Sequence, residues 1–204
     1  DAGILFEQRA QEIVDLLNKT RRDLQQRELV SGTVALGCVE TIASHMLPDL
    51  LKAFSSRYPQ VRYALYSADG DDIREKLDRG ELDFGILLEP VEAAKYDVLR
   101  LPCQEQWGIV LRQSDPLAKK RQLSAQDVLP LPLILPRREI VQNHIAGWLA
   151  VERGQLNIFA EHNLLGNAAL LVEAGLGYVI CSHGAFLLHG KDSLCFRPLT
   201  PEHS

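Results

Sequence analysis

Hydrophobic residues follow two alternating patterns along the first half of the chain. Short β-rich or continuously apolar runs at 33–38, 61–67 and 83–88 predict strands. Between them, residues 41–58 and 69–79 carry apolar positions at helical spacing, and Pro59 and Gly80 mark the ends of these two helices. Two consecutive strand–helix–strand units predict a parallel sheet covered by helices.

The second half repeats this style without repeating the sequence. It predicts strands at 107–111, 131–135, 157–160, 178–181 and 194–197, and helices at 124–129, 140–153, 167–174 and 185–188. Two small α/β lobes fit this arrangement better than one sheet, with their boundary between Leu99 and Glu105. We therefore expect a first lobe at residues 32–103 and a second at residues 104–204.

Residues 1–31 have a different pattern, that of one long helix. Its apolar residues follow the alternating three- and four-residue steps of a narrow seam, namely Phe6, Ala10, Ile13, Leu17 and Leu24. A helix lying on its own domain usually shows a wider apolar stripe. The narrow seam favours pairing with a second copy, so we expect a linker helix that forms a dimer.

Composition narrows the class of protein. The 204 residues are 46% hydrophobic with a net charge of −5, which fits a globular core and argues against direct DNA binding by these residues. No apolar run approaches the ~20 residues of a membrane helix, and the opening residues do not have the pattern of a signal peptide. Four scattered cysteines without a CxxC pair favour reduced thiols in the cytoplasm, and a Cys38–Cys181 redox pair stays open.

Motifs of catalysis and of cofactor binding are missing from the sequence. Ser182 and His183 are adjacent but lack a GxSxG elbow, and Gly175 and Gly177 follow a helix without completing GxGxxG. The six histidines show neither HExxH spacing nor a cysteine partner at zinc-ligand distance. We expect no enzyme activity, no cofactor and no metal.

The stretch GTVALGCVETIASHMLPDLLKAFSSRYPQVRYALYSADGDDIREKLDRGELDFGIL, which starts at Gly32, strongly resembles the start of the effector-binding domain of LysR-type transcriptional regulators. The later EHNLLGNAALLVEAGLGYVI resembles the helix–AGLG–strand segment of this family, and AGILFEQRAQEIV resembles the entry into its linker helix. The resemblance covers nearly the whole chain in the right order. Two departures stand out: Ser182 replaces a frequent proline, and the family continues beyond the point matching Ser204 with a return to the first lobe.

The resemblance implies two Rossmann-like lobes of the periplasmic-binding-protein type (type II), preceded by a long linker helix. It also implies a homodimer or tetramer that senses a small polar or anionic effector between the lobes. DNA would be bound through an N-terminal domain that these residues do not include, and no membrane would be involved. The alternative function is a stand-alone solute-binding protein of the same fold, which would carry an export signal and lack a dimerising helix.

Ligands of open parallel sheets bind beyond the carboxyl ends of the strands, where helix N-termini favour anions. Four segments meet this description, and the predicted effector-binding residues are Val39, Glu40, Thr41, Ser67, Ala68, Asp69, Gly70, Pro136, Arg137, Arg138, His162 and Asn163.

The candidate residues have different chemistry. Thr41 stands at the usual Ser/Thr position of the family and can donate to a carboxylate, or simply cap a helix. Arg137 and Arg138 suit bidentate binding of an anion, with a solvated loop pair as the alternative. Glu40 would repel a carboxylate, so it points away or binds an amine or hydroxyl, and Asp69 is expected to cap a helix.

Overall fold

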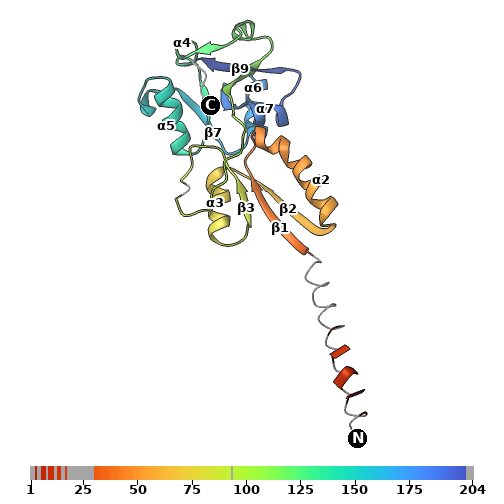
Figure 1. Ribbon diagram of the computed structural model, residues 1–204. Coiled ribbons are helices and arrows are strands. Elements are labelled where there is room, and N and C mark those ends of the chain that lie inside the picture. The colour runs from red at the N-terminus through yellow and green to blue at the C-terminus, as the bar shows by residue number, and fades with distance from the viewer. Residues whose placement is uncertain are drawn as a thin grey trace.

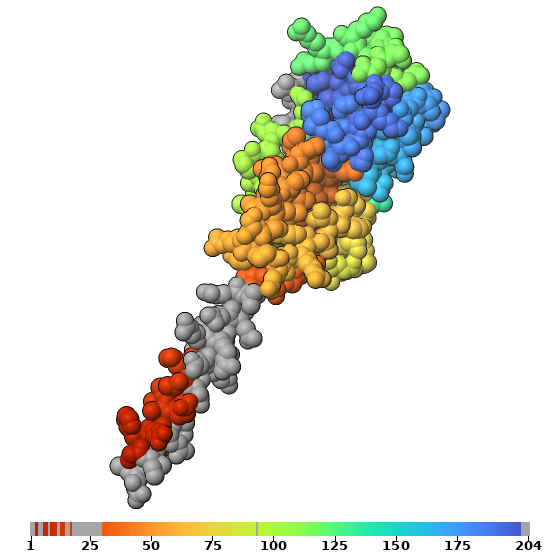
Figure 2. Space-filling view, turned by 90° about the vertical axis from the view of Figure 1, so that its right-hand side faces the viewer, coloured from red at the N-terminus to blue at the C-terminus, as the bar shows by residue number. Residues whose placement is uncertain are grey.

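The computed structural model describes residues 30–92 and 94–200, together with residues 3, 6, 7, 9–11, 13, 14 and 17 of the N-terminal segment. The described residues of that segment are helical and lie at one end of the molecule, away from both lobes (Figures 1 and 2). Phe6 and Leu17 of the predicted seam are 77% and 65% exposed, and Ile13 is similarly exposed. Leu24 lies outside the described residues. In a single chain, Phe6, Ile13 and Leu17 therefore face solvent, and Ala10 is half-buried.

Lobe I is built on a three-stranded parallel sheet of order β2-β1-β3. Its strands are β1 (Ser31–Cys38), β2 (Gln60–Ser67) and β3 (Phe84–Ile86). The central strand β1 pairs with β2 over its whole length, from Ser31 with Gln60 to Cys38 with Ser67. The parallel sheet predicted for this half is confirmed.

Two helical segments connect the strands of lobe I. The first is a 3-10 helix, η1 (Ile42–Met46), that continues into α2 (Leu47–Arg57), and the second is α3 (Gly70–Asp78). Pro48 stands in the first turn of α2, where its missing N–H costs nothing. Gly80 follows α3 with a φ of 68°, as expected for a glycine that ends a helix.

The core of lobe I is small and lies on the α3 side of the sheet. Ile73 of α3 is fully buried against Ala68 and Leu82. On the opposite face, Leu65 and Phe84, the partners of Leu36 on either side, are 59% and 62% exposed. Lobe I thus leaves one sheet face largely uncovered.

Lobe II contains a six-stranded mixed sheet of order β5-β9-β4-β8-β6-β7. Strand β4 pairs antiparallel with β8 and β9, whereas β6 pairs parallel with β7 and β8. The strands are β4 (Trp107–Arg112), β5 (Leu123–Ser124), β6 (Leu133–Pro136), β7 (Ile158–His162), β8 (Tyr178–Ser182) and β9 (Leu194–Thr200).

Helices cover both faces of the lobe II sheet (Figure 1). They are α4 (Ala125–Val128), α5 (Glu139–Trp148), α6 (Leu165–Glu173) and α7 (His183–His189), with short 3-10 helices η2 (Pro116–Lys119) and η3 (Arg153–Gln155). One buried cluster centres on Ile109 and Leu135, and another joins Val110 to Leu165 and Val172. These clusters make lobe II the larger hydrophobic core.

Helix α5 ends five residues earlier than the sequence predicts. The apolar pattern continues to residue 153, but the chain leaves the helix after Trp148. Ala150 adopts a φ of 56°, and its N–H and that of Val151 bond the carbonyls of Gly147 and Ala146. This is a Schellman ending in which alanine takes the position usually held by glycine. The sequence therefore lacks the usual stop signal.

The two lobes pack at one end of α2. Helix α7 of lobe II contacts η1 of lobe I, and Gly184 makes this possible. A Cβ at Gly184 would lie 1.9 Å from the backbone nitrogen of Ile42. Among the described residues, no helix is long and apolar enough to cross a membrane.

Candidate functional site between the lobes

A cleft lies between the lobes, where the carboxyl ends of β1, β6, β7 and β8 come together. Its cavity volume is about 90 Å³, well below the ~300–1,000 Å³ of typical small-molecule sites. The lining residues come from both lobes and are Val39, Glu40, Thr41, Asp69, Gly70, Leu88, Trp107, Pro136, Arg138, His162, Asn163, Leu164, Leu165, Cys181, Ser182 and Ala185. At this volume the cleft admits only part of a typical small-molecule ligand, so a larger ligand requires side chains or lobes to move.

Glu40 of lobe I reaches across the cleft into lobe II. Its Oε1 lies 2.5 Å from Nε2 of His189, and its Oε2 accepts from the backbone N–H of Leu165 at 3.4 Å. The Glu40 carbonyl accepts from the hydroxyl of Ser182 at 3.1 Å. The residue therefore joins the lobes through both its side chain and its backbone.

A cluster of ion pairs bridges the cleft on the α3 side. Arg137 donates from Nε to Asp69 at 2.5 Å and from Nη2 to Asp72 at 2.7 Å, and Nε of Arg138 donates to Asp71 at 3.0 Å. The carboxylates hold the pKa of the Arg137 guanidinium above its ordinary value, chiefly through the hydrogen bond to Asp69. Both arginines predicted to bind an effector anion are thus already paired with carboxylates of lobe I.

Asp69 also caps α3, as predicted. Its Oδ1 accepts from the backbone N–H groups of Asp71 and Asp72 at 3.0 and 3.1 Å. The buried carboxylate therefore serves the helix N-terminus through one oxygen and the ion pair with Arg137 through the other. This double use fixes the first turn of α3 against lobe II.

The guanidinium of Arg138 lies against the backbone of Gly70. A Cβ at Gly70 would lie 2.8 Å from Nη1 of Arg138. Arg138 is only 7% exposed, and its Nη2 has no hydrogen-bond partner among the described residues. The absence of a side chain at position 70 therefore lets a buried, partly unpaired guanidinium lie beside the cleft.

His162 is a second polar group of the cleft without a described partner. Its ring nitrogens form no hydrogen bond of ordinary geometry to the described residues, although the backbone of Leu164 and Ile180 lies close enough to act on the ring. Burial lowers the pKa of the imidazole, and the neighbouring backbone and the charge of Glu40 only partly offset this effect. His162 is therefore a neutral side chain with one donor and one acceptor to offer.

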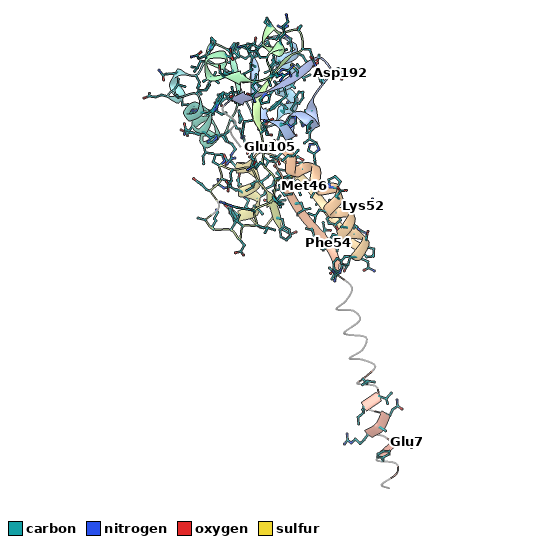
Figure 3. The ribbon with its side chains drawn as sticks, turned by 45° about the horizontal axis from the view of Figure 1, so that its top comes forward. Glu7, Met46, Lys52, Phe54, Glu105 and Asp192 are labelled. Carbon is teal, nitrogen blue, oxygen red and sulfur yellow. The ribbon has the colours of Figure 1, made fainter. Side chains whose placement is uncertain are left out.

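Glu105 lies where the chain crosses from lobe I to lobe II, close to Met46 at the junction of η1 and α2 (Figure 3). Its buried carboxylate accepts from the backbone N–H of Ile42 at 2.6 Å and from that of Gly184 at 2.9 Å. One carboxylate thus caps η1 of lobe I and α7 of lobe II together. Glu105 connects the lobes directly at the edge of the cleft.

Nine of the twelve residues predicted from sequence line the cleft. Ser67 is exposed, Ala68 belongs to the core of lobe I, and Arg137 takes part through its ion pairs without lining the cavity. Thr41 is buried in the lining and also begins η1, where its carbonyl accepts from the N–H of Ser44. The four predicted segments therefore do converge, although three of their residues do not face the cavity.

The sequence reasoning missed several contributors to the cleft. Ser182 and Ala185 follow the carboxyl end of β8, a position that the strand-end rule would have included. Glu105 and Leu88 carry no comparable signal, because their place depends on how the connecting segment passes between the lobes. Only the three-dimensional structure brings these two residues to the cleft.

Among the described residues, no group of three or more His, Cys, Asp or Glu side chains could hold a metal ion. The cysteines are free thiols, and burial raises the pKa values of Cys38 and Cys181, which disfavours the reactive thiolate. Charged and polar groups from two lobes around a small cavity suit recognition of a small polar molecule.

Such a fold and cleft define a two-lobe small-molecule-binding domain of the periplasmic-binding-protein type. Residues 27–203 match the family model of the LysR substrate binding domain, and the chain belongs to this family.

Relatives in sequence are transcriptional regulators. The HTH-type transcriptional regulator YfeR of Shigella flexneri is 26% identical over 212 residues, covering 98% of this chain and 66% of YfeR. The HTH-type regulator YvbU of Bacillus subtilis is 28% identical over 110 residues, covering 54% of this chain and 37% of YvbU. The chain therefore spans less than two thirds of the length of these relatives.

Solved structures share the fold at low sequence identity. A full-length OxyR variant from Pseudomonas aeruginosa has a TM-score of 0.71 at 22% identity, covering 95% of this chain and 66% of that one. The effector binding domain of QuiR, solved in complex with shikimate, has a TM-score of 0.67 at 18% identity, covering 85% and 83% of the two chains.

Proposed function

We propose that this chain is the effector-sensing part of a LysR-type transcriptional regulator, with the linker helix at residues 1–31, lobe I at 32–103 and lobe II at 104–204. The observation that carries the proposal is the cleft itself, which is closed by contacts of Glu40, Asp69 and Glu105 between the lobes. A molecule larger than the cavity of about 90 Å³ would have to alter these contacts. Effector binding and lobe arrangement are therefore coupled.

In this mechanism the effector shifts the relative arrangement of the two lobes. It does so only by binding one arrangement more tightly than the other, since a ligand with equal affinity for both shifts nothing. The exposed seam that contains Phe6, Ile13 and Leu17 would pair with a second copy and carry the change to DNA-binding domains outside these residues. The protein is thus proposed to act as a cytoplasmic homodimer or tetramer without catalysing a reaction.

The twelve predicted site residues remain the proposed effector-binding set, with Arg137 acting through its ion pairs. Pro136, Asn163 and Val39 line the cavity and would shape it, whereas Thr41 would donate its hydroxyl. The effector is proposed to be a small polar molecule. QuiR supports a polar ligand, because its effector binding domain was solved with shikimate.

The full-length regulator provides the test. Its binding to fragments of the genomic DNA of its source organism is measured by gel mobility shift, with shikimate and a panel of small polar metabolites added in turn. We expect DNA binding without additives and a changed mobility or affinity with one of the compounds. A full-length protein that neither binds DNA nor responds to any compound would contradict the proposal.

The alternative function is a stand-alone solute-binding protein. It predicts ligand binding by a monomer, unaffected by removal of the linker helix. Analytical ultracentrifugation of the 204-residue chain, and of a variant with Ile13 and Leu17 changed to Asp, separates the two functions. We expect a dimer that the two substitutions dissociate, because charges in an apolar seam prevent pairing.

A further inference from the structure

Helix α6 has no capping group of its own at its N-terminus. Its N-cap residue is Leu164, which makes no side-chain capping bond, and its first turn holds no acidic residue. The carboxylate of Glu40 fills this position instead, with Oε2 at the N–H of Leu165 and Oε1 at His189. A helix N-terminus and an adjacent imidazole are the kind of environment in which a free anion binds. In this cleft a side chain of lobe I occupies it.

The neighbouring helix N-termini of the cleft are occupied in the same way. Asp69 caps α3, and Glu105 accepts from Gly184 at the start of α7. At each of these three helix N-termini the position that could attract a free carboxylate is filled by a carboxylate of the chain, whereas α5 begins beside the cleft at Arg138 without a side-chain cap. An incoming anion therefore finds no vacant helix N-terminus among these three.

The charge balance around the cleft also disfavours an anion. Five carboxylates gather there against three guanidinium groups, those of Arg74, Arg137 and Arg138, and each guanidinium is paired with at least one aspartate. The carboxylates are those of Glu40, Asp69, Asp71, Asp72 and Glu105. A ligand carboxylate at α6 would lie next to Glu40, where the two like charges repel each other.

Uncharged polar recognition remains available. Arg138 is nine-tenths buried in the lining of the cleft, and its Nη2 has no hydrogen-bond partner among the described residues. The two ring nitrogens of His162 likewise have no hydrogen bond of ordinary geometry to the described residues. Nη2 of Arg138 and one ring nitrogen of the neutral His162 can donate to a hydroxyl or carbonyl oxygen, and the other ring nitrogen and Glu40 can accept from an O–H or N–H. The vacant hydrogen-bonding capacity therefore suits a ligand that both donates and accepts.

We propose that Glu40 determines effector specificity, acting as an internal anion at the N-terminus of α6. The effector is then a hydroxyl- or amine-bearing molecule that places no anionic group at α6, contacts Arg138 and His162, and donates to Glu40. This inference rests on the proposed function, because it concerns the same cleft. It reduces the effector class from small polar or anionic molecules to those without a free anionic group at α6.

Inorganic sulfate is the probe for this inference. Its binding to the 204-residue chain is measured by isothermal titration calorimetry for wild type, Glu40→Ala and the control Asp49→Ala. Asp49 lies in the first turn of α2 and is exposed, so the control removes one negative charge outside the cleft. We expect Glu40→Ala to bind sulfate at least about tenfold more tightly than wild type, and Asp49→Ala to behave as wild type.

The NMR signal of the Leu165 backbone amide shows whether sulfate binds at the N-terminus of α6. This signal should shift on addition of sulfate to Glu40→Ala and stay unchanged in wild type. If Glu40→Ala does not fold, Glu40→Gln serves in its place, since it keeps an acceptor for Leu165 and removes only the charge; a smaller gain of sulfate affinity is then expected.

Equal sulfate affinity in wild type and the Glu40 variants overturns the inference, and so does a failure of every Glu40 variant to gain binding. A gain that leaves the Leu165 amide signal unmoved overturns it as well. None of these outcomes touches the proposed function, which depends on DNA binding and effector response of the full-length regulator.

Discussion

Arg137 and Asp69 form a 2.5 Å ion pair across the cleft, between a loop of lobe II and the N-cap of α3 in lobe I. The same carboxylate accepts from two backbone N–H groups of α3 through its other oxygen. The start of one helix is thus tied to the opposite lobe. A change in lobe arrangement must break or reshape this contact, which makes it a measurable part of the proposed mechanism.

The two partners of this pair should differ in their contributions to stability. Asp69→Ala removes the helix cap and is expected to lower the free energy of unfolding by about 1–2 kcal/mol. Arg137→Ala should cost less than about 1 kcal/mol, because the guanidinium is 46% exposed and water screens its charge. Urea unfolding followed by circular dichroism measures both values. An equal or larger loss for Arg137→Ala would mean that the ion pair, and not the cap, dominates.

Glu105 should contribute more to the free energy of unfolding than any exposed carboxylate of the chain. Glu105→Ala leaves the N–H groups of Ile42 and Gly184 without their acceptor, which is expected to cost about 2–4 kcal/mol. Glu105→Gln keeps one acceptor oxygen and should lose less. Urea unfolding of both variants, with Asp49→Ala as the exposed control, measures the difference. A loss in Glu105→Ala no greater than in the control would contradict the bridging role.

The sequence predicted the parts of this molecule that depend on local pattern. The parallel strands β1, β2 and β3 and the cap at Asp69 follow from periodicity and from the chemistry of short acidic side chains. The end of α5 did not follow, because Ala150 adopts a glycine-like conformation that no residue type signals.

The candidate site could likewise be predicted only where it depends on local sequence pattern and topology. Glu40 and Arg137 follow the carboxyl ends of strands, and this alone predicted that they lie near the cleft, because the place of a strand end depends on topology. Their partners did not follow, because each contact joins residues more than 60 positions apart and depends on how the lobes pack. The guanidinium groups therefore looked free for an effector in the sequence but are paired in the fold.

Gly184 should tolerate no side chain while the lobes keep their present contact. In Gly184→Ala the new Cβ would lie 1.9 Å from the nitrogen of Ile42 and 2.1 Å from the carbonyl carbon of Thr41, and backbone atoms cannot yield as a flexible side chain can. We expect a loss of at least about 2 kcal/mol in the free energy of unfolding.

Gly147→Ala is the matched control for this substitution. It adds a methyl group to α5 where nothing lies within 4 Å, so it should be neutral or stabilise by up to about 1 kcal/mol. Thermal unfolding of both variants distinguishes a local clash from a general effect of alanine. A fully stable Gly184→Ala would show that α7 and η1 do not contact each other as closely as the structure has them.

His162 should make the stability of the domain depend on pH. Burial lowers the pKa of its imidazole in the folded state below the ordinary value of 6.5, so folding favours the neutral form. The contribution of the neutral ring is complete above pH 6.5 and is lost as the pH falls through the lowered pKa, because the unfolded chain then binds a proton that the folded chain resists.

The variant His162→Gln tests this pH dependence, because it removes the titrating imidazole but keeps a polar side chain. The melting temperatures of wild type and His162→Gln are measured from about pH 8 to about pH 5. The melting temperature of wild type should fall relative to that of the variant as the pH decreases. A constant difference across that range would show that the ring protonates as readily in the folded cleft as in the unfolded chain.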